Sequence, residues 1–141
     1  MYRERIRNVM KGEKLLTASP ETTVAEAARM MAGGRVGAIV VVVDDGALEG
    51  IFTERDALIR VIAQGRDANT TRLAEVMTTE PLSIDPDKTF GHAQQLMNIQ
   101  GFRHVPVVED GKTVGIVSAR DALDPEMEEF VCEANRRKSI R

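Results

Sequence analysis

The sequence is poor in the residues that support redox chemistry and metal binding. It contains one cysteine, Cys132, no tryptophan, and two histidines, His92 and His104. A single cysteine excludes an internal disulfide and any cysteine-cluster metal site, and the histidines lack the cysteines that would complete a zinc set. No Ser/His/Asp set, pair of catalytic carboxylates or P-loop stands out. We therefore expect a protein that is not an enzyme and carries no metal or catalytic cofactor.

Long apolar runs and a strong excess of one charge are missing as well. No segment approaches the roughly 20 apolar residues that cross a bilayer, and the N-terminus leads into no apolar signal segment. The formal net charge of −3 gives no global reason to bind nucleic acid. These absences predict a cytoplasmic protein whose partners include neither a membrane nor nucleic acid. One alternative stays open, because the basic residues within 136–141 could bind RNA or DNA.

What the sequence does contain is an internal repeat. The segment Gly-Ile-Phe-Thr-Glu-Arg-Asp at residues 50–56 returns as Gly-Ile-Val-Ser-Ala-Arg-Asp at residues 115–121. Upstream of it, Met31 returns as Met97 at nearly the same offset. A repeat of this length is too long for a solenoid unit and predicts two similar α/β modules in tandem.

Each copy has the same predicted order of elements, β-α-β-β-α. Thr23 and Thr89 are expected to cap the first helix of each copy, which glycines then end. An apolar strand follows, and a turn of acidic residues and glycine sends the chain back as a hairpin. The first of these strands, residues 38–43, is so continuously apolar that both of its faces should be covered. After the hairpin of the first copy, a second helix is expected from Thr53 to Gly65.

The repeat divides the chain into five predicted segments. Two halves of roughly 60 residues are expected to share one core, because either alone would bury too little surface. A third helix is expected at about residues 126–137. The segments are an N-terminal extension at 1–8, repeat 1 at 9–65, a polar linker at 66–75, repeat 2 at 76–124, and a C-terminal helix with a basic tail at 125–141.

Both copies end in a hydroxyl, an arginine and an aspartate where a strand gives way to a helix. They are Thr53, Arg55 and Asp56 in the first copy, and Ser118, Arg120 and Asp121 in the second. The hydroxyl and the carboxylate fit a capping box, which would be a purely structural role. That role leaves the two arginines unexplained, because a cation in the first turn opposes the helix dipole.

A functional interpretation uses all three residues together. A carboxylate can accept hydrogen bonds from both hydroxyls of a ribose. A helix N-terminus, a hydroxyl and a guanidinium together suit a phosphate. The repeated motif therefore predicts a site for a nucleoside phosphate, and the helix-cap explanation stays open as its alternative.

The doubled pattern resembles a tandem CBS domain pair, or Bateman module. The resemblance rests on Gly-Ile-x-Ser/Thr-x-x-Asp at the end of each copy and on His-Val-Pro-Val-Val at residues 104–108. Val-Met-Lys at 9–11 and Val-Met-Thr at 76–78 resemble the lead-in that opens each copy in this family. The resemblance covers about residues 8–124. It implies an α/β (α+β) fold of two repeats packed with pseudo-twofold symmetry, with short helical extensions.

The resemblance also implies two ligand clefts, each built from the closing motif of one copy and the lead-in of the other. One cleft would use Thr53, Arg55 and Asp56 with Thr78 and the backbone near Leu82. The other would use Ser118, Arg120 and Asp121 with Lys11, the backbone near Leu16, Arg103 and His104. The two aspartates would hold ribose, and the cationic residues would hold phosphate. The second cleft has more cationic partners, so we expect it to bind phosphate more tightly.

By the same resemblance, the bound ligand is expected to be an adenine nucleotide, AMP first, then ATP, ADP or NAD. Binding would regulate a protein that the sequence does not identify, through a change of shape or partner. Members of the family commonly form homodimers, so a homodimer is expected. The alternative from a different functional class is a homodimerisation or scaffold module with vestigial pockets.

Overall fold

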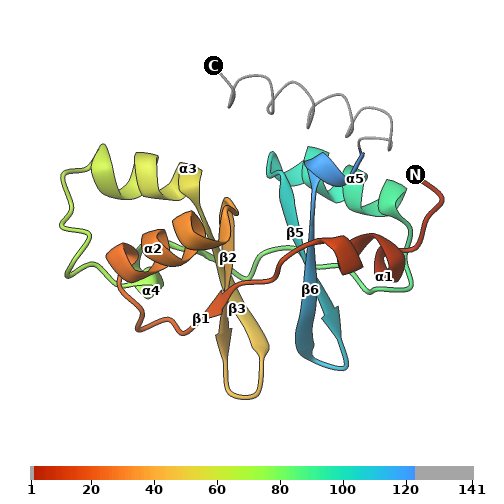
Figure 1. Ribbon diagram of the computed structural model, residues 1–141, viewed down its shortest axis with the longest axis horizontal. Coiled ribbons are helices and arrows are strands. Elements are labelled where there is room, and N and C mark those ends of the chain that lie inside the picture. The colour runs from red at the N-terminus through yellow and green to blue at the C-terminus, as the bar shows by residue number, and fades with distance from the viewer. Residues whose placement is uncertain (1, 123–141) are drawn as a thin grey trace, which may run out of the picture.

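The structure, a computed structural model, describes residues 2–122 of the chain (Figure 1). The helix predicted at 126–137, Cys132 and the basic tail lie outside the described residues. Within the described part, two units stand side by side, and helices cover the outer side of each unit's β-hairpin. None of the helices within residues 2–122 is long and apolar enough to cross a membrane.

The first unit is built around a four-stranded sheet. Its elements are β1 (Thr17–Ala18), α2 (Val24–Gly34), β2 (Ala38–Val43), β3 (Ala47–Thr53), α3 (Glu54–Asp56), the π-helix η2 (Ala57–Ile62) and, from later in the chain, β4 (Thr78–Thr79). The strand order is β1-β2-β3-β4, in which β2 and β3 form the predicted antiparallel hairpin. Thr23 caps α2 as predicted, since its hydroxyl accepts a hydrogen bond from the Glu26 N–H at 3.2 Å.

The second unit repeats this plan with fewer strands. Its elements are α5 (Phe90–Gln100), β5 (His104–Glu109), β6 (Lys112–Ser118) and the 3-10 helix η3 (Ala119–Ala122). Thr89 caps α5 by accepting a hydrogen bond from the His92 N–H at 3.3 Å. Gly101 ends α5 in the left-handed conformation at φ 71°, which costs glycine nothing. Both predicted caps and the predicted stop at Gly101 are confirmed, whereas the predicted stop at Gly33 and Gly34 is wrong, because α2 includes both glycines and ends at Arg35.

The apolar run of β2 is covered on both faces, as its sequence predicted. Ile39 and Val41 point into the core beneath α2, whereas Ala38 and Val40 belong to a cluster shared with the second unit. Successive side chains of a strand point to opposite faces, so a strand between two buried layers must be apolar throughout.

The helix after Thr53 is present, but its hydrogen bonding differs from a regular α-helix. The Ala63 N–H donates to the Leu58 carbonyl at 2.9 Å, and the Arg66 N–H donates to the Val61 carbonyl at 3.0 Å. The first bond spans five residues within the helix, which is the pattern of a π-helix. The second bond closes the end of the helix around Gly65, whose φ is 69°. Local sequence patterns do not distinguish this widened turn from an α-helical one.

Two segments at the predicted starts of the repeats complete the core of the opposite repeat. Helix α1 (Ile6–Val9) and the 3-10 helix η1 (Met10–Gly12) span the predicted boundary between the N-terminal extension and repeat 1, yet they pack on repeat 2. Ile6 is fully buried there, and its N–H donates to the Lys88 carbonyl at 2.9 Å. Conversely, α4 (Leu73–Val76) spans the predicted boundary between the linker and repeat 2, and it contributes to the core of repeat 1. Each repeat is therefore completed by the lead-in of the other.

The two units meet through the inner faces of their strands. A buried cluster joins Val40 and Ile51 of the first unit with Ile116 of the second. At the far end of the sheets, the Thr113 N–H donates to the Gly46 carbonyl at 2.9 Å. This shared core gives the fold that the sequence predicted, two α/β repeats packed against each other.

Candidate functional site

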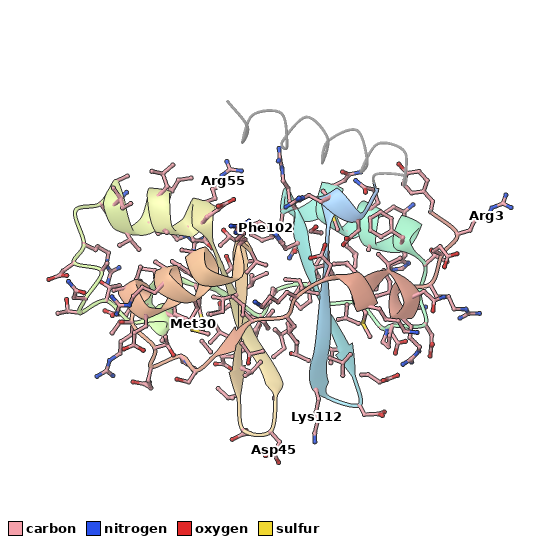
Figure 2. The ribbon with its side chains drawn as sticks, viewed as in Figure 1. Arg3, Met30, Asp45, Arg55, Phe102 and Lys112 are labelled. Atoms are coloured by element: carbon pink, nitrogen blue, oxygen red, sulfur yellow. The ribbon has the colours of Figure 1, made fainter. Side chains whose placement is uncertain are left out.

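A cleft of about 200 Å³ lies between the two units at one end of their sheets. Figure 2 shows Arg55 and Phe102 at one end of the molecule, and Asp45 and Lys112 at the hairpin turns of the opposite end. The cleft is at the end of Phe102, because it is lined where β2 and β5 begin and where β3 and β6 end. Its lining residues are 13–14, 35–38, 54, 103–104, 116 and 118–120.

The backbone fixes this arrangement in the same way in both repeats. The Ala119 N–H donates to the Arg103 carbonyl at 2.8 Å, and the Glu54 N–H donates to the Gly37 carbonyl at 2.9 Å. In each repeat, the residue just after the second hairpin strand donates a hydrogen bond to the residue just before the first hairpin strand. The cleft walls therefore come from pseudo-equivalent positions, with Arg103 in repeat 2 where repeat 1 has glycine.

Four of the residues predicted for the second cleft line this cleft together. They are Arg103, His104, Ser118 and Arg120. Three others do not line it. Asp121 is in η3 and accepts a hydrogen bond from the Ser118 N–H at 2.8 Å. Lys11 is in η1 and exposed, and the Leu16 carbonyl accepts a hydrogen bond from the Val40 N–H at 2.9 Å.

The cleft carries charges of both signs, with positive charge in excess. Four cationic side chains line it, and two carboxylates oppose them. The cations are Lys14, Arg35, Arg103 and Arg120, and the carboxylates are Glu13 and Glu54. The cleft therefore suits an anionic ligand better than a cationic one.

His104 does not add to this positive charge near neutral pH. Its pKa is lowered, mainly because burial penalises the charged imidazolium, and Arg103 lowers it further. Glu13 and Glu54 act in the opposite direction and only partly compensate. A neutral imidazole can still donate one hydrogen bond to a ligand oxygen.

The hydroxyl of Ser118 already has a partner in the cleft. Ser118 is 5% exposed, and its hydroxyl lies 3.4 Å from the Glu13 carboxylate, to which it donates. Glu13 is not among the residues predicted from the sequence. Glu13 lies two residues after Lys11, next to the lead-in that the family resemblance pairs with the closing motif of the other repeat. This position was the signal from which it could have been predicted.

The first closing motif is a complete capping box. The Asp56 carboxylate accepts hydrogen bonds from the Thr53 N–H at 2.9 Å and from its hydroxyl at 3.1 Å. In return, the Thr53 hydroxyl accepts from the Asp56 N–H at 3.2 Å. Asp56 is 8% exposed, and Arg60 lies 3.6 Å from its second oxygen. The helix-cap explanation of Thr53 and Asp56 is thus satisfied in full.

Arg60, which the sequence analysis missed, joins this motif to the lead-in of repeat 2. Its guanidinium donates to the carbonyls of Val76 and Met77, both at 3.2 Å. Thr78 follows directly and pairs with Ile51 in the sheet. The Thr78 hydroxyl is buried and has no hydrogen-bond partner among residues 2–122. Two further predicted residues, Arg55 and Leu82, are exposed.

The match to a known protein family agrees with this geometry. The model of the CBS domain matches the chain twice, at residues 6–63 and at residues 73–126. Both matches begin at the lead-in segments that the structure places in the opposite repeat. The chain belongs to the CBS domain family.

Relatives of this CBS pair come from several organisms. The CBS domain-containing protein YhcV of Bacillus subtilis is 43% identical over 108 residues, which cover 77% of this chain and 76% of that protein. An uncharacterised conserved protein from Pyrococcus horikoshii has a similar crystal structure, with a TM-score of 0.77 at 31% identity, over 96% of this chain and 95% of that one. The chain spans between 54% and 76% of the first three curated relatives.

Some of the similar structures contain ligands. The CBS domain pair of protein MJ0100, in complex with 5′-methylthioadenosine and S-adenosyl-L-methionine, has a TM-score of 0.74 at 26% identity. The alignment covers 84% of this chain and 91% of that one. Both of its ligands contain an adenosine group.

Proposed function

We propose that this CBS pair is a regulatory module that binds an adenosyl ligand in the cleft between its repeats. The observation that carries the proposal is the meeting of Arg103, His104, Ser118 and Arg120 in one cleft with the lead-in of the other repeat. These residues supply guanidinium groups, an imidazole and a hydroxyl, which are groups that bind a phosphate. The adenosyl ligands of the MJ0100 pair support the same ligand class.

The charge of the cleft favours a monophosphate. Four cations against two carboxylates leave an excess of about two positive charges while His104 is neutral. A phosphate monoester carries about −1.5 to −2 at pH 7, which matches that excess. Ala38 and Ile116 supply an apolar wall for the base. We therefore place AMP first, with ATP, ADP and NAD next.

Signalling requires that the ligand favour one state of the protein over another. A ligand that touches residues 35–38 of repeat 1 and 118–120 of repeat 2 can change how the repeats sit together. We expect the protein to form a homodimer that responds to such a change. Leu58, Ile59 and Ile62 on η2 are 58%, 47% and 69% exposed, and a second copy would cover them. A cytoplasmic location remains part of this proposal.

The second candidate is a homodimerisation or scaffold module that binds no ligand. The complete capping box of Thr53 and Asp56 favours it, because it explains two of the repeated residues without a ligand. The Ser118–Glu13 hydrogen bond favours it in the same way.

A thermal-shift panel separates the two candidates. It comprises AMP, ADP, ATP, NAD, NADH, S-adenosylmethionine and 5′-methylthioadenosine on the purified protein. A ligand at about 100 times its dissociation constant adds roughly 2.7 kcal/mol, which raises Tm by several degrees in a protein of this size. A rise with one ligand that is lost in Arg120→Ala supports the regulatory module. No rise with any ligand supports the scaffold.

A further inference from the structure

Arg35 has a left-handed backbone conformation, and repeat 2 has a glycine, Gly101, at the equivalent position. It follows α2 with φ 56° and ψ 39°, and Gly101 follows α5 with φ 71° and ψ 18°. The left-handed region crowds the Cβ of any residue other than glycine, and asparagine and aspartate relieve this best. Arginine is neither, so repeat 1 retains strain that repeat 2 avoids.

The helix end explains the conformation but not the arginine. The Val36 N–H donates to the Met31 carbonyl at 3.1 Å, and the Arg35 N–H donates to the Ala32 carbonyl at 3.3 Å. These bonds close the last turn of α2 through a left-handed residue, for which glycine is the favoured choice. Strained residues of this kind concentrate at ligand sites.

The side chain of Arg35 lies at the cleft. Arg35 lines it from repeat 1, opposite the repeat that supplies Arg103 and Arg120. Within residues 2–122, the Arg35 guanidinium forms no hydrogen bond and no ion pair. Its five donors are therefore available for an anion, and their fork matches phosphate oxygens.

We propose that Arg35 is a further ligand-contact residue, which binds the phosphate of the ligand from the side of repeat 1. The inference rests on the proposed function and assigns it a specific contact. A phosphate held by Arg35 on one side and by Arg103 and Arg120 on the other links the two repeats. The strain at Arg35 is retained because glycine at this position would remove that contact.

The test compares AMP with adenosine, which differ only in the phosphate. Dissociation constants and Tm are measured for the full chain and for Arg35→Gly, Arg35→Lys and Asp44→Gly. Asp44 is a matched control, because it also has a positive φ, of 50°, but lies in the hairpin turn between β2 and β3.

Arg35→Gly is expected to raise Tm by a few degrees, because it relieves strain and removes one of four like charges. It is also expected to weaken AMP binding about tenfold and to leave adenosine binding unchanged. Arg35→Lys should keep part of the preference for AMP. Asp44→Gly should bind both ligands as the natural chain does.

Equal binding of AMP by the natural chain and Arg35→Gly overturns the inference and leaves the proposed function standing. If the natural chain binds neither AMP nor adenosine and no other ligand of the thermal-shift panel, the proposed function fails, and inorganic pyrophosphate serves as the probe. A Tm rise with pyrophosphate that Arg35→Gly loses then supports an anion site at Arg35. No rise in either protein overturns the inference as well.

Discussion

Met77 packs its sulfur directly against the backbone of Gly50. A Cβ atom on Gly50 would lie 2.6 Å from the Met77 Sδ and 2.8 Å from the Thr78 carbonyl oxygen. The second repeat has the same relationship, since a Cβ on Gly115 would lie 2.7 Å from the Sδ of Met10. Each methionine belongs to the lead-in of the other repeat, so the repeated glycine is explained by this exchange of segments.

Gly50→Ala is expected to destabilise the protein by about 1–3 kcal/mol, the usual cost of overpacking a core. Gly115→Ala should cost less, because the three atoms nearest to its Cβ all belong to the side chain of Met10 and none to the backbone. Gly33→Ala is the control, since its Cβ would meet nothing within 4 Å and alanine favours the helix by roughly 0.5–1 kcal/mol. Urea unfolding of the three variants measures the order of their stabilities. If Gly50→Ala is as stable as the natural chain, the close contact between Gly50 and Met77 is contradicted.

The N-terminal lead-in should matter to stability as much as a central core residue does. Ile6 is fully buried in repeat 2, so Ile6→Ala is expected to cost about 2–5 kcal/mol in chemical unfolding. Ile99 on α5 is 76% exposed, and Ile99→Ala should change stability by no more than about 0.5 kcal/mol. Equal stability of both variants would show that residues 6–12 do not complete the core of repeat 2.

The lowered pKa of His104 predicts a pH dependence of stability. Below its unfolded value of about 6.5, the unfolded chain binds a proton that the folded chain resists, so stability falls as the solution is acidified. His104→Gln should flatten this loss, and His92→Gln, at an exposed position, should not. Unfolding curves between about pH 5 and 7 measure it, with NMR titration of the imidazole as the direct check. A measured pKa of the His104 imidazole at or above 6.5 would contradict this prediction. It would show that burial and Arg103 do not outweigh the opposing effect of Glu13 and Glu54.

The local features of the fold were predictable from the sequence. Thr23 and Thr89 cap their helices, and the run 38–43 is buried on both faces, because side-chain chemistry at these positions decides the outcome locally. The exchange of lead-ins was not predictable from local patterns. It depends on contacts such as Ile6 with Lys88, which lie more than 80 positions apart in the chain.

The candidate site was predicted in part, for a similar reason. Arg103 and Ser118 follow from the repeated motif and the family resemblance, and the structure places both at the cleft. Glu13 lies outside the motifs, and Glu54 corresponds to Ala119 in the second copy, so neither glutamate is repeated and only the folded arrangement brings both to the cleft. Arg35 left one signal in the sequence, a cation at the helix end where the other copy has Gly101.

The exposed apolar side chains of η2 predict a homodimer that a single charge can disrupt. Ile62→Glu is expected to convert the protein to a monomer in analytical ultracentrifugation, because Ile62 is 69% exposed beside Leu58 and Ile59. Ile99→Glu, which places the same charge on an exposed isoleucine of α5, should leave the dimer intact. A natural chain that sediments as a monomer would refute the dimer, and loss of the dimer in both variants would refute its location.

The most direct test of the account is calorimetric titration of AMP into the natural chain, Arg120→Ala and Arg55→Ala. Arg120 lines the cleft between the repeats, and Arg55 holds the equivalent position in the first closing motif. The account predicts AMP binding that Arg120→Ala weakens at least tenfold and Arg55→Ala leaves nearly unchanged. Equal losses in both variants, or binding that survives Arg120→Ala, would contradict the assignment of the phosphate to this cleft.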